Sequence, residues 1–270
     1  MRRQQAHLLI VAALAGLPFV AQAHVPWLLP NATMATGKEA VVSVDAVLSE
    51  DLFTFERALK IERLTITGPD GIKLEAQNHS AARNHESFDV TLPKEGTYRI
   101  SNFSRSVMGA YKLGGETKRF RGELSEVPAG AEITSLTVMR NRQETFVSRE
   151  EAGETKFAPE GDGLELLPLG AVTDLSSGDS TRFKLLLDGK PLANAAVTAR
   201  RGGNRYRYKM GEITLKTDAQ GEFTMQWSEP GQYWIGANAG ERGGPGGMGG
   251  TREQPLQRAA VSATFEVLPK

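Results

Sequence analysis

Hydrophobic and polar residues alternate through most of the chain, in short segments. The alternation is clear in residues 39–48 (EAVVSVDAVL), 87–101 (SFDVTLPKEGTYRIS) and 212–227 (EITLKTDAQGEFTMQW). A period of two places successive side chains on opposite faces of a strand, and the Gly, Pro and Asp residues between the segments are typical of turns. Helical periodicity is almost absent, so the pattern predicts an all-β fold.

The chain also resembles itself at an offset of 135 residues, which superimposes residues 88–100 (FDVTLPKEGTYRI) on residues 223–235 (FTMQWSEPGQYWI). In both segments a tyrosine follows a glycine by two residues, as in the tyrosine corner of immunoglobulin-like sandwiches. The superimposed pairs are Phe88/Phe223, Val90/Met225, Leu92/Trp227, Gly96/Gly231, Tyr98/Tyr233 and Ile100/Ile235. We predict two tandem immunoglobulin-like or transthyretin-like β-sandwich domains; the alternative is two unrelated hairpins with similar turns.

Composition places the boundary between the two sandwiches in residues 148–163 (SREEAGETKFAPEGDG), which are charged and poor in hydrophobic residues. We expect the N-terminal sandwich over residues 24–150 and the C-terminal sandwich over residues 160–270. Residues 239–254 are rich in glycine, and we expect them to form a flexible loop before the last strand.

Residues 1–23 have the pattern of a cleaved export signal. Two arginines precede an apolar run from Leu8 to Val20, and the segment ends in Ala-Gln-Ala, which signal peptidase accepts. The apolar run is shorter than the ~20 residues of a membrane-spanning helix, and no later segment approaches that length. We therefore expect a periplasmic protein without a transmembrane segment, whose mature chain begins at His24.

Charge and cysteine content narrow the function classes. Without Arg2 and Arg3, 30 of the 32 basic residues remain against 32 acidic residues, a charge of about −2 at neutral pH, so we expect no nucleic-acid partner. The chain has no cysteine, which excludes disulfides, thiolate metal ligands and a cysteine nucleophile. Nitrogen, oxygen and thioether groups remain as candidate ligands.

A histidine at the mature N-terminus offers two nitrogens, the α-amino group and the imidazole, to one metal ion. Imidazole and amine nitrogens suit Cu(II), Ni(II) and Zn(II), and a further imidazole would complete a histidine brace. The two other histidines of the mature chain, His79 and His85, both precede the strand that begins near Phe88. If that strand is the fifth of an immunoglobulin-like sandwich, His24, His79 and His85 lie at one end of the domain and form the predicted metal site.

A different metal motif, further ligands and a metal-free state are alternatives to this site. The planar copper or nickel motif with histidine in third place is excluded, because the third mature residue is Pro26, which has no amide proton. Glu86, Asp89 and Met108 are further candidate ligands. The alternative without metal is that cleavage falls elsewhere and that the three histidines are solvated.

Residues 200–210 (RRGGNRYRYKM) concentrate cations and tyrosines around a turn. They suit either an anionic ligand or an exposed hairpin. The remaining sequence has no nucleophile elbow, no phosphate-binding glycine loop before a helix and no helix with paired histidines. We therefore expect a protein that is not an enzyme.

Motifs along the mature chain resemble those of a family of exported bacterial proteins, often described as the periplasmic component of nickel or cobalt uptake and similar to NikM-type proteins. The motifs are AHVPWLLP, GLELLPLG, LLDGKPLANAAV, TDAQGEF, PGQYWI and ATFEVLP. The resemblance implies a divalent-metal-binding accessory protein that works beside a metal transporter or an outer-membrane receptor, and its motif includes His24 and Trp27. A terminus at histidine itself departs from the nickel members and favours copper.

The leading hypothesis is a periplasmic protein that binds one divalent transition-metal ion, copper, nickel or cobalt, for uptake or delivery. A first alternative is a tandem β-sandwich that serves as a metal-free interaction or structural module. A second is a histidine-brace copper oxidase, which would need a flat aromatic binding face; aromatic residues are only 7% of this chain.

Overall fold

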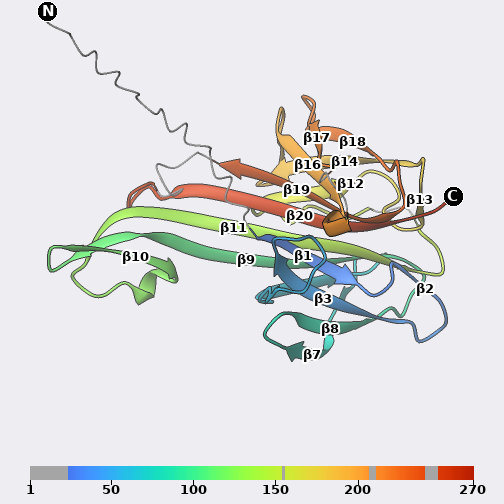
Figure 1. Ribbon diagram of the computed structural model, residues 1–270, viewed down its shortest axis with the longest axis horizontal. Helices are drawn as coiled ribbons and strands as arrows, with labels where there is room; N and C mark the ends of the chain where they lie inside the picture. The colour runs from blue at the N-terminus through green and yellow to red at the C-terminus, as the bar shows by residue number, and fades with distance from the viewer. Residues whose placement is uncertain (1–23, 154–155, 207–210, 241–248) are drawn as a thin grey trace, which may run out of the picture.

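The computed structural model describes residues 24–153, 156–206, 211–240 and 249–270. These residues form strands and two short 3-10 helices, which confirms the predicted all-β, sandwich-like fold. A long central sheet has one smaller sheet on each face (Figure 1). Among the described residues, no helix has the length and hydropathy needed to cross a bilayer.

The N-terminal sheet has the strand order β1-β3-β8-β7, and β4 pairs with the end of β3. Its neighbouring strands are antiparallel, so β1 and β8 run in the same direction on either side of β3. The bounds are β1 (Val25–Pro30), β3 (Val41–Ser49), β4 (Arg57–Ala58), β7 (Gln77–Ala81) and β8 (Glu86–Thr91).

The central sheet has the order β17-β16-β19-β20-β11-β9-β5-β6, with β10, β13 and β2 paired at its margins. Its first-half strands are β2 (Met34–Ala35), β5 (Arg63–Thr67), β6 (Lys73–Leu74), β9 (Gly96–Leu113), β10 (Glu116–Gly122) and β11 (Glu132–Arg149). Its second-half strands are β13 (Leu175–Ser176), β16 (Ala196–Arg201), β17 (Ile213–Lys216), β19 (Gly231–Gly240) and β20 (Leu256–Leu268).

The C-terminal sheet consists of β12 (Leu164–Pro168), β14 (Ser180–Leu187), β15 (Lys190–Pro191) and β18 (Glu222–Gln226). The 3-10 helices are η1 (Leu124–Glu126) and η2 (Asn204–Tyr206).

Two large hydrophobic cores lie on opposite faces of the central sheet, and a smaller cluster around Trp27 joins β1 and β3 to Trp234 of β19. The N-terminal core packs the inner face of the N-terminal sheet on β5, β9 and β11, and the C-terminal core packs the C-terminal sheet on β16, β19 and β20. Successive residues of β11 lie in different cores: Val147 is buried in the N-terminal core and Phe146 in the C-terminal core. This follows from the period of two along a strand that is covered on both faces.

The two sandwiches are joined through one continuous sheet. β11 of the first half pairs with β20 of the second half in parallel, from Thr137/Leu256 to Thr145/Thr264. Residues 148–163 are also tied to the body, since Glu160 Oε2 accepts a hydrogen bond of 2.6 Å from the buried Arg142. The charged segment between the sandwiches is therefore packed against them where it is described.

The internal similarity corresponds to equivalent positions in the two sandwiches. Every hydrophobic pair that the offset superimposes is buried. Gly96 and Gly231 both have positive φ angles, 113° and 141°, which a side chain rarely tolerates. The Tyr98 hydroxyl donates to the Lys94 carbonyl at 2.6 Å, and the Tyr233 hydroxyl donates to the Glu229 carbonyl at 2.8 Å. Both halves therefore have the predicted tyrosine corner.

The tyrosine corners yield a first prediction. Replacing Tyr98 or Tyr233 with phenylalanine is expected to lower the free energy of unfolding by about 1 kcal/mol each, the typical net contribution of one hydrogen bond. Urea unfolding measures the change. Tyr206→Phe is the matched control because its side chain is 84% exposed, and a loss equal to that of the control would contradict the corner assignment.

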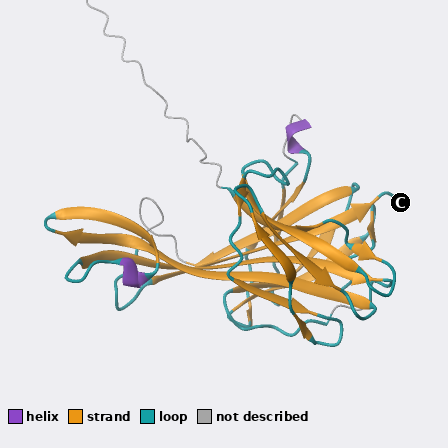
Figure 2. Ribbon diagram, turned by 90° about the horizontal axis from the view of Figure 1, so that it is seen from below, coloured by secondary structure: helices purple, strands orange, loops and turns teal. Residues whose placement is uncertain are grey.

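β9 and β11 extend beyond both cores. Together with β10 they form a projecting arm, residues 106–137 (Figure 2). Tyr111 and Phe120 pack against each other on the arm, with ring centroids 6.0 Å apart. The predicted signal peptide, residues 1–23, and residues 241–248 of the glycine-rich segment lie outside the described residues.

Candidate functional site

The start of β1 is fixed by packing on both sides of the strand. Trp27 is fully buried, and its indole N–H donates to the Ser49 hydroxyl at 2.8 Å. The Pro26 carbonyl accepts hydrogen bonds from the Trp234 indole and the Ser262 hydroxyl, both at 3.0 Å. These contacts hold the residue that precedes the strand, His24, against the body of the protein.

His24 lies beside two carboxylates of the loop that follows β3. Its Nε2 is 3.9 Å from Glu50 Oε1, and the two side chains are 31% and 54% exposed. Glu56 accepts hydrogen bonds from the backbone N–H groups of Glu50 and Asp51, at 3.0 and 3.2 Å. These N–H groups, with smaller contributions from the nearby His24 and Arg205, hold the pKa of Glu56 below its ordinary value.

His85 lies in the turn before β8 and has a different carboxylate neighbour. Its Nε2 is 4.0 Å from Asp45 Oδ1, and its ring packs edge-on against Phe55 with centroids 5.3 Å apart. Burial raises the pKa of the Asp45 carboxyl, and the charge of His85 partly offsets the rise. The acidic neighbour of His85 is therefore on β3 and differs from that of His24.

His79 lies one strand further, on β7. Its Nε2 is 3.0 Å from Glu86 Oε2, the same oxygen that accepts the backbone N–H of Ile61. The His79 ring is 52% exposed. The pair joins β7 to the start of β8.

The three histidines therefore share one end of the N-terminal sheet without sharing a partner. The starts of β1 and β8 both lie at the carboxyl end of β3, as the sequence analysis expects, but β3 and β4 stand between them. Within the described residues, no three His, Cys, Asp or Glu side chains form a group that could hold a metal ion. The joint ligand set of His24, His79 and His85 stays a prediction.

The further candidate ligands have other partners. Glu86 contacts His79, and Asp89 accepts hydrogen bonds from Ser43 at 2.5 Å and Asn78 at 2.8 Å. These bonds hold the pKa of Asp89 below its usual range. Met108 lies on the arm, where it pairs with Arg121 of β10.

The described part of residues 200–210 has acidic partners within the chain. Arg200 contacts Glu212 at 2.8 Å, Arg201 pairs with Glu229, and Arg205 Nε donates to Asp51 Oδ2 at 2.9 Å. Residues 207–210 lie outside the described residues. The arginines therefore stabilise contacts within the protein, and the last of them joins the two sandwiches.

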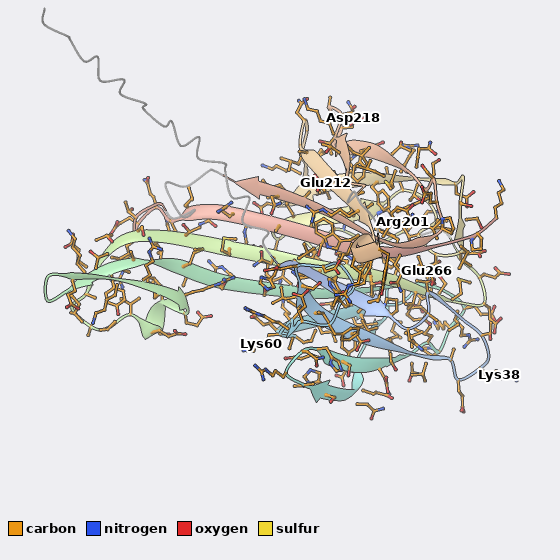
Figure 3. All side chains as sticks on the ribbon, in the orientation of Figure 1. Lys38, Lys60, Arg201, Glu212, Asp218 and Glu266 are labelled. Carbon is orange, nitrogen blue, oxygen red and sulfur yellow. The ribbon has the colours of Figure 1, made fainter. Side chains whose placement is uncertain are left out.

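Sequence reasoning missed a cleft of about 440 Å³ between the two halves of the chain. One wall is the loop of residues 51–55, directly after Glu50, and the other is residues 202–206. The second wall follows Arg201, the last residue of β16, which is labelled in Figure 3. Gln232 of β19 completes the lining. The two walls are about 150 residues apart in sequence, so only the fold brings them together.

Phe53 at this cleft has a strained backbone, with φ of +65°. A bulky residue rarely adopts this conformation, which costs on the order of 1–3 kcal/mol. Its ring packs against Trp27, with centroids 5.5 Å apart, and against Gly202, where an added Cβ would lie 2.6 Å from the ring. Packing between the sandwiches therefore maintains the strain, a feature that is common at ligand-binding sites.

Comparison with known proteins places the chain in a family. No curated protein matches the sequence. Among solved structures, the chain is similar to trypsin-activated alpha-2-macroglobulin from Escherichia coli, with 14% identity and a TM-score of 0.23, over 90% of this chain and 16% of that one. This chain therefore spans only a small part of the length of that alpha-2-macroglobulin.

The chain is also similar to the D0-D1 domain of intimin, with 12% identity and a TM-score of 0.21, over 88% of this chain and 97% of that one. The FN1-FN3 domains of chicken CNTN1 share 6% identity with a TM-score of 0.21, over 90% of this chain and 99% of theirs. A family model described as "Domain of unknown function (DUF4198)" matches residues 21–241. Because this match covers most of its length, the chain belongs to the DUF4198 family.

Proposed function

We propose that the protein is an exported, periplasmic binding protein that holds one divalent transition-metal ion at the start of β1, for uptake or delivery of the metal. The observation that carries this proposal is the distance of 3.9 Å between His24 Nε2 and Glu50 Oε1. Nitrogen and oxygen ligands lie about 2.0–2.2 Å from such an ion, so two donors of one ion are no more than about 4.3 Å apart. The two side chains can therefore bind the same ion.

Cleavage before His24 would also free an α-amino group. Once it loses its proton, which titrates near ~8, this group chelates an ion together with Nδ1 of the same imidazole, so it offers a second binding mode beside the Nε2–Glu50 pair. Imidazole nitrogen, amine nitrogen and carboxylate oxygen suit copper, nickel or cobalt. The resemblance of AHVPWLLP to NikM-type proteins supports the same class of cargo, with a metal transporter or an outer-membrane receptor component as partner.

The test is a metal titration of the exported protein, after intact mass has located its first residue. Native mass spectrometry with one equivalent of Cu(II), Ni(II) or Co(II) is expected to show one retained ion. His24→Ala is expected to weaken binding by about 100-fold or more, because loss of an outer-shell partner alone costs up to that factor. The melting temperature of the metal-free protein should not change.

Matched variants sharpen the assignment. Glu50→Gln should weaken binding, whereas Glu39→Gln, an exposed carboxylate beyond the opposite end of β3, should not. His79→Ala and His85→Ala test in the same titration whether these residues complete the ligand set. Undiminished affinity in His24→Ala would overturn the proposed site.

A second candidate is a metal-free interaction module, which the projecting arm favours. The arm places the end of β9, together with β10 and η1, away from both cores, where a partner can reach them (Figure 2). This candidate predicts no rise in melting temperature with metal. A specific ligand at one hundred times its Kd would instead stabilise the protein by about 2.7 kcal/mol.

A further inference from the structure

The cleft between the two sandwiches adjoins the proposed metal position. Asp51 lines the cleft and follows Glu50 directly in the chain. Glu56 accepts the N–H groups of both residues, and Arg205 on the opposite wall donates to Asp51 at 2.9 Å. An ion held by His24 and Glu50 would therefore lie next to the cleft opening.

The lining of the cleft suits a small ligand that carries a ring and an anionic group. Phe55 is 41% exposed and Tyr206 is 84% exposed, so both rings offer unoccupied surface for stacking. Arg205 lines the same cleft, pairs with Asp51 at 2.9 Å and keeps 54% of its side chain exposed. A guanidinium is well suited to bind a carboxylate through charge-assisted hydrogen bonds.

The proposed metal position supplies two donor atoms, which are His24 Nε2 and Glu50 Oε1. Copper, nickel and cobalt ions take four to six ligands in tetrahedral, tetragonal or octahedral geometry. An amine-carboxylate chelator could occupy the remaining positions. Its side chain would then extend from the ion into the cleft.

We propose that the protein binds its metal as a complex with a small ring-bearing chelator, whose amine and carboxylate bind the ion and whose ring lies between Phe55 and Tyr206. This inference rests on the proposed function, because it needs the ion at His24. The strained Phe53 backbone fits the same role, since Phe53 lines the cleft and its ring packs against Trp27. The ligand class is thus an amino-acid-like metal chelate with an aromatic or similarly planar side chain.

The test compares two copper chelates that differ only in the ring. Glycine and L-phenylalanine bind Cu(II) through the same amine and carboxylate, so a difference in ternary-complex affinity reports the ring alone. Isothermal titration of the mature protein is expected to show the phenylalanine chelate binding about tenfold more tightly, the effect of partly burying one phenyl group. Phe55→Ala should abolish this preference while Cu(II) alone still binds.

Ile72→Ala is the matched control, since Ile72 is a similarly exposed hydrophobic residue in the β5–β6 turn, 46% exposed. It should leave the preference unchanged. Equal affinity for both chelates in a protein that retains Cu(II) would overturn the chelate proposal alone. A protein that retains no Cu(II) would overturn the proposed function as well. Equal binding of L-phenylalanine without copper would identify a metal-independent site and also overturn the chelate proposal.

Discussion

Replacing Arg99 with methionine is expected to lower the free energy of unfolding by about 3–5 kcal/mol, because it leaves a buried carboxylate without its cation. The Arg99 side chain is 3% exposed, and its Nε donates to Glu144 Oε1 at 2.9 Å. Glu144 is fully buried. Glu160 and Glu165 each have an oxygen 3.8 Å from the same guanidinium.

A double variant separates the loss of charge pairing from the loss of packing. Arg99→Met with Glu144→Leu removes both charges and is expected to recover most of the stability, since a hydrophobic replacement of a buried ion pair is often neutral or stabilising. Urea unfolding gives both values. Arg105→Met, an exposed arginine on the same strand, should stay within about 0.5 kcal/mol of the native protein. A loss below about 1 kcal/mol in Arg99→Met would contradict the assignment.

This charge cluster explains which part of the fold the sequence pattern could not predict. The period of two predicts strands correctly, because each short segment has one face in a core. Residues 142–148 of β11 are instead buried on both faces, and they include Arg142 and Glu144. Charged residues are normally exposed to solvent, so the sequence of residues 142–148 predicts a strand with one face on the surface. This run also carries part of the pairing of β11 with β20, so the same misreading conceals the sheet that the two sandwiches share.

Residues 148–163 illustrate the same ambiguity. Their composition is that of a linker, yet Glu160 binds Arg142, and the backbone N–H of Gly161 donates to the buried Glu165 at 2.8 Å. Composition reports how polar a segment is and carries no information on where its charges find partners. The contacts that hold this segment against the two sandwiches are therefore visible only in the structure.

The candidate site was predictable to a similar extent. That His24 and His85 lie at one end of a sheet follows from two strands antiparallel to a third. The separation between them depends on how many strands intervene, at about 4.8 Å per strand, and the alternation of residues does not specify strand order. The sequence does not indicate the cleft, because Asp51 and Arg205 belong to different halves of the chain.

Replacing Trp27 with alanine is expected to lower the free energy of unfolding by about 3–5 kcal/mol and also to weaken metal binding. Trp27 is fully buried beside Phe53 and Phe55, with ring centroids 5.5 and 5.6 Å away, and it anchors the strand that begins after His24. Without the indole, β1 loses its main contact with the loop that carries Glu50. Metal affinity, measured well below the melting temperature, should therefore fall when this contact is lost.

Trp227 provides a matched comparison in the other sandwich. It is also fully buried, and its indole N–H donates to the Thr181 hydroxyl at 2.9 Å, as that of Trp27 donates to Ser49. Trp227→Ala should cost a similar free energy of unfolding and leave metal affinity intact. If either alanine variant fails to fold, Trp27→Phe and Trp227→Phe repeat the comparison with a smaller loss of folding stability. An equal loss of metal affinity from both substitutions would show that general destabilisation, and not the position of β1, controls binding.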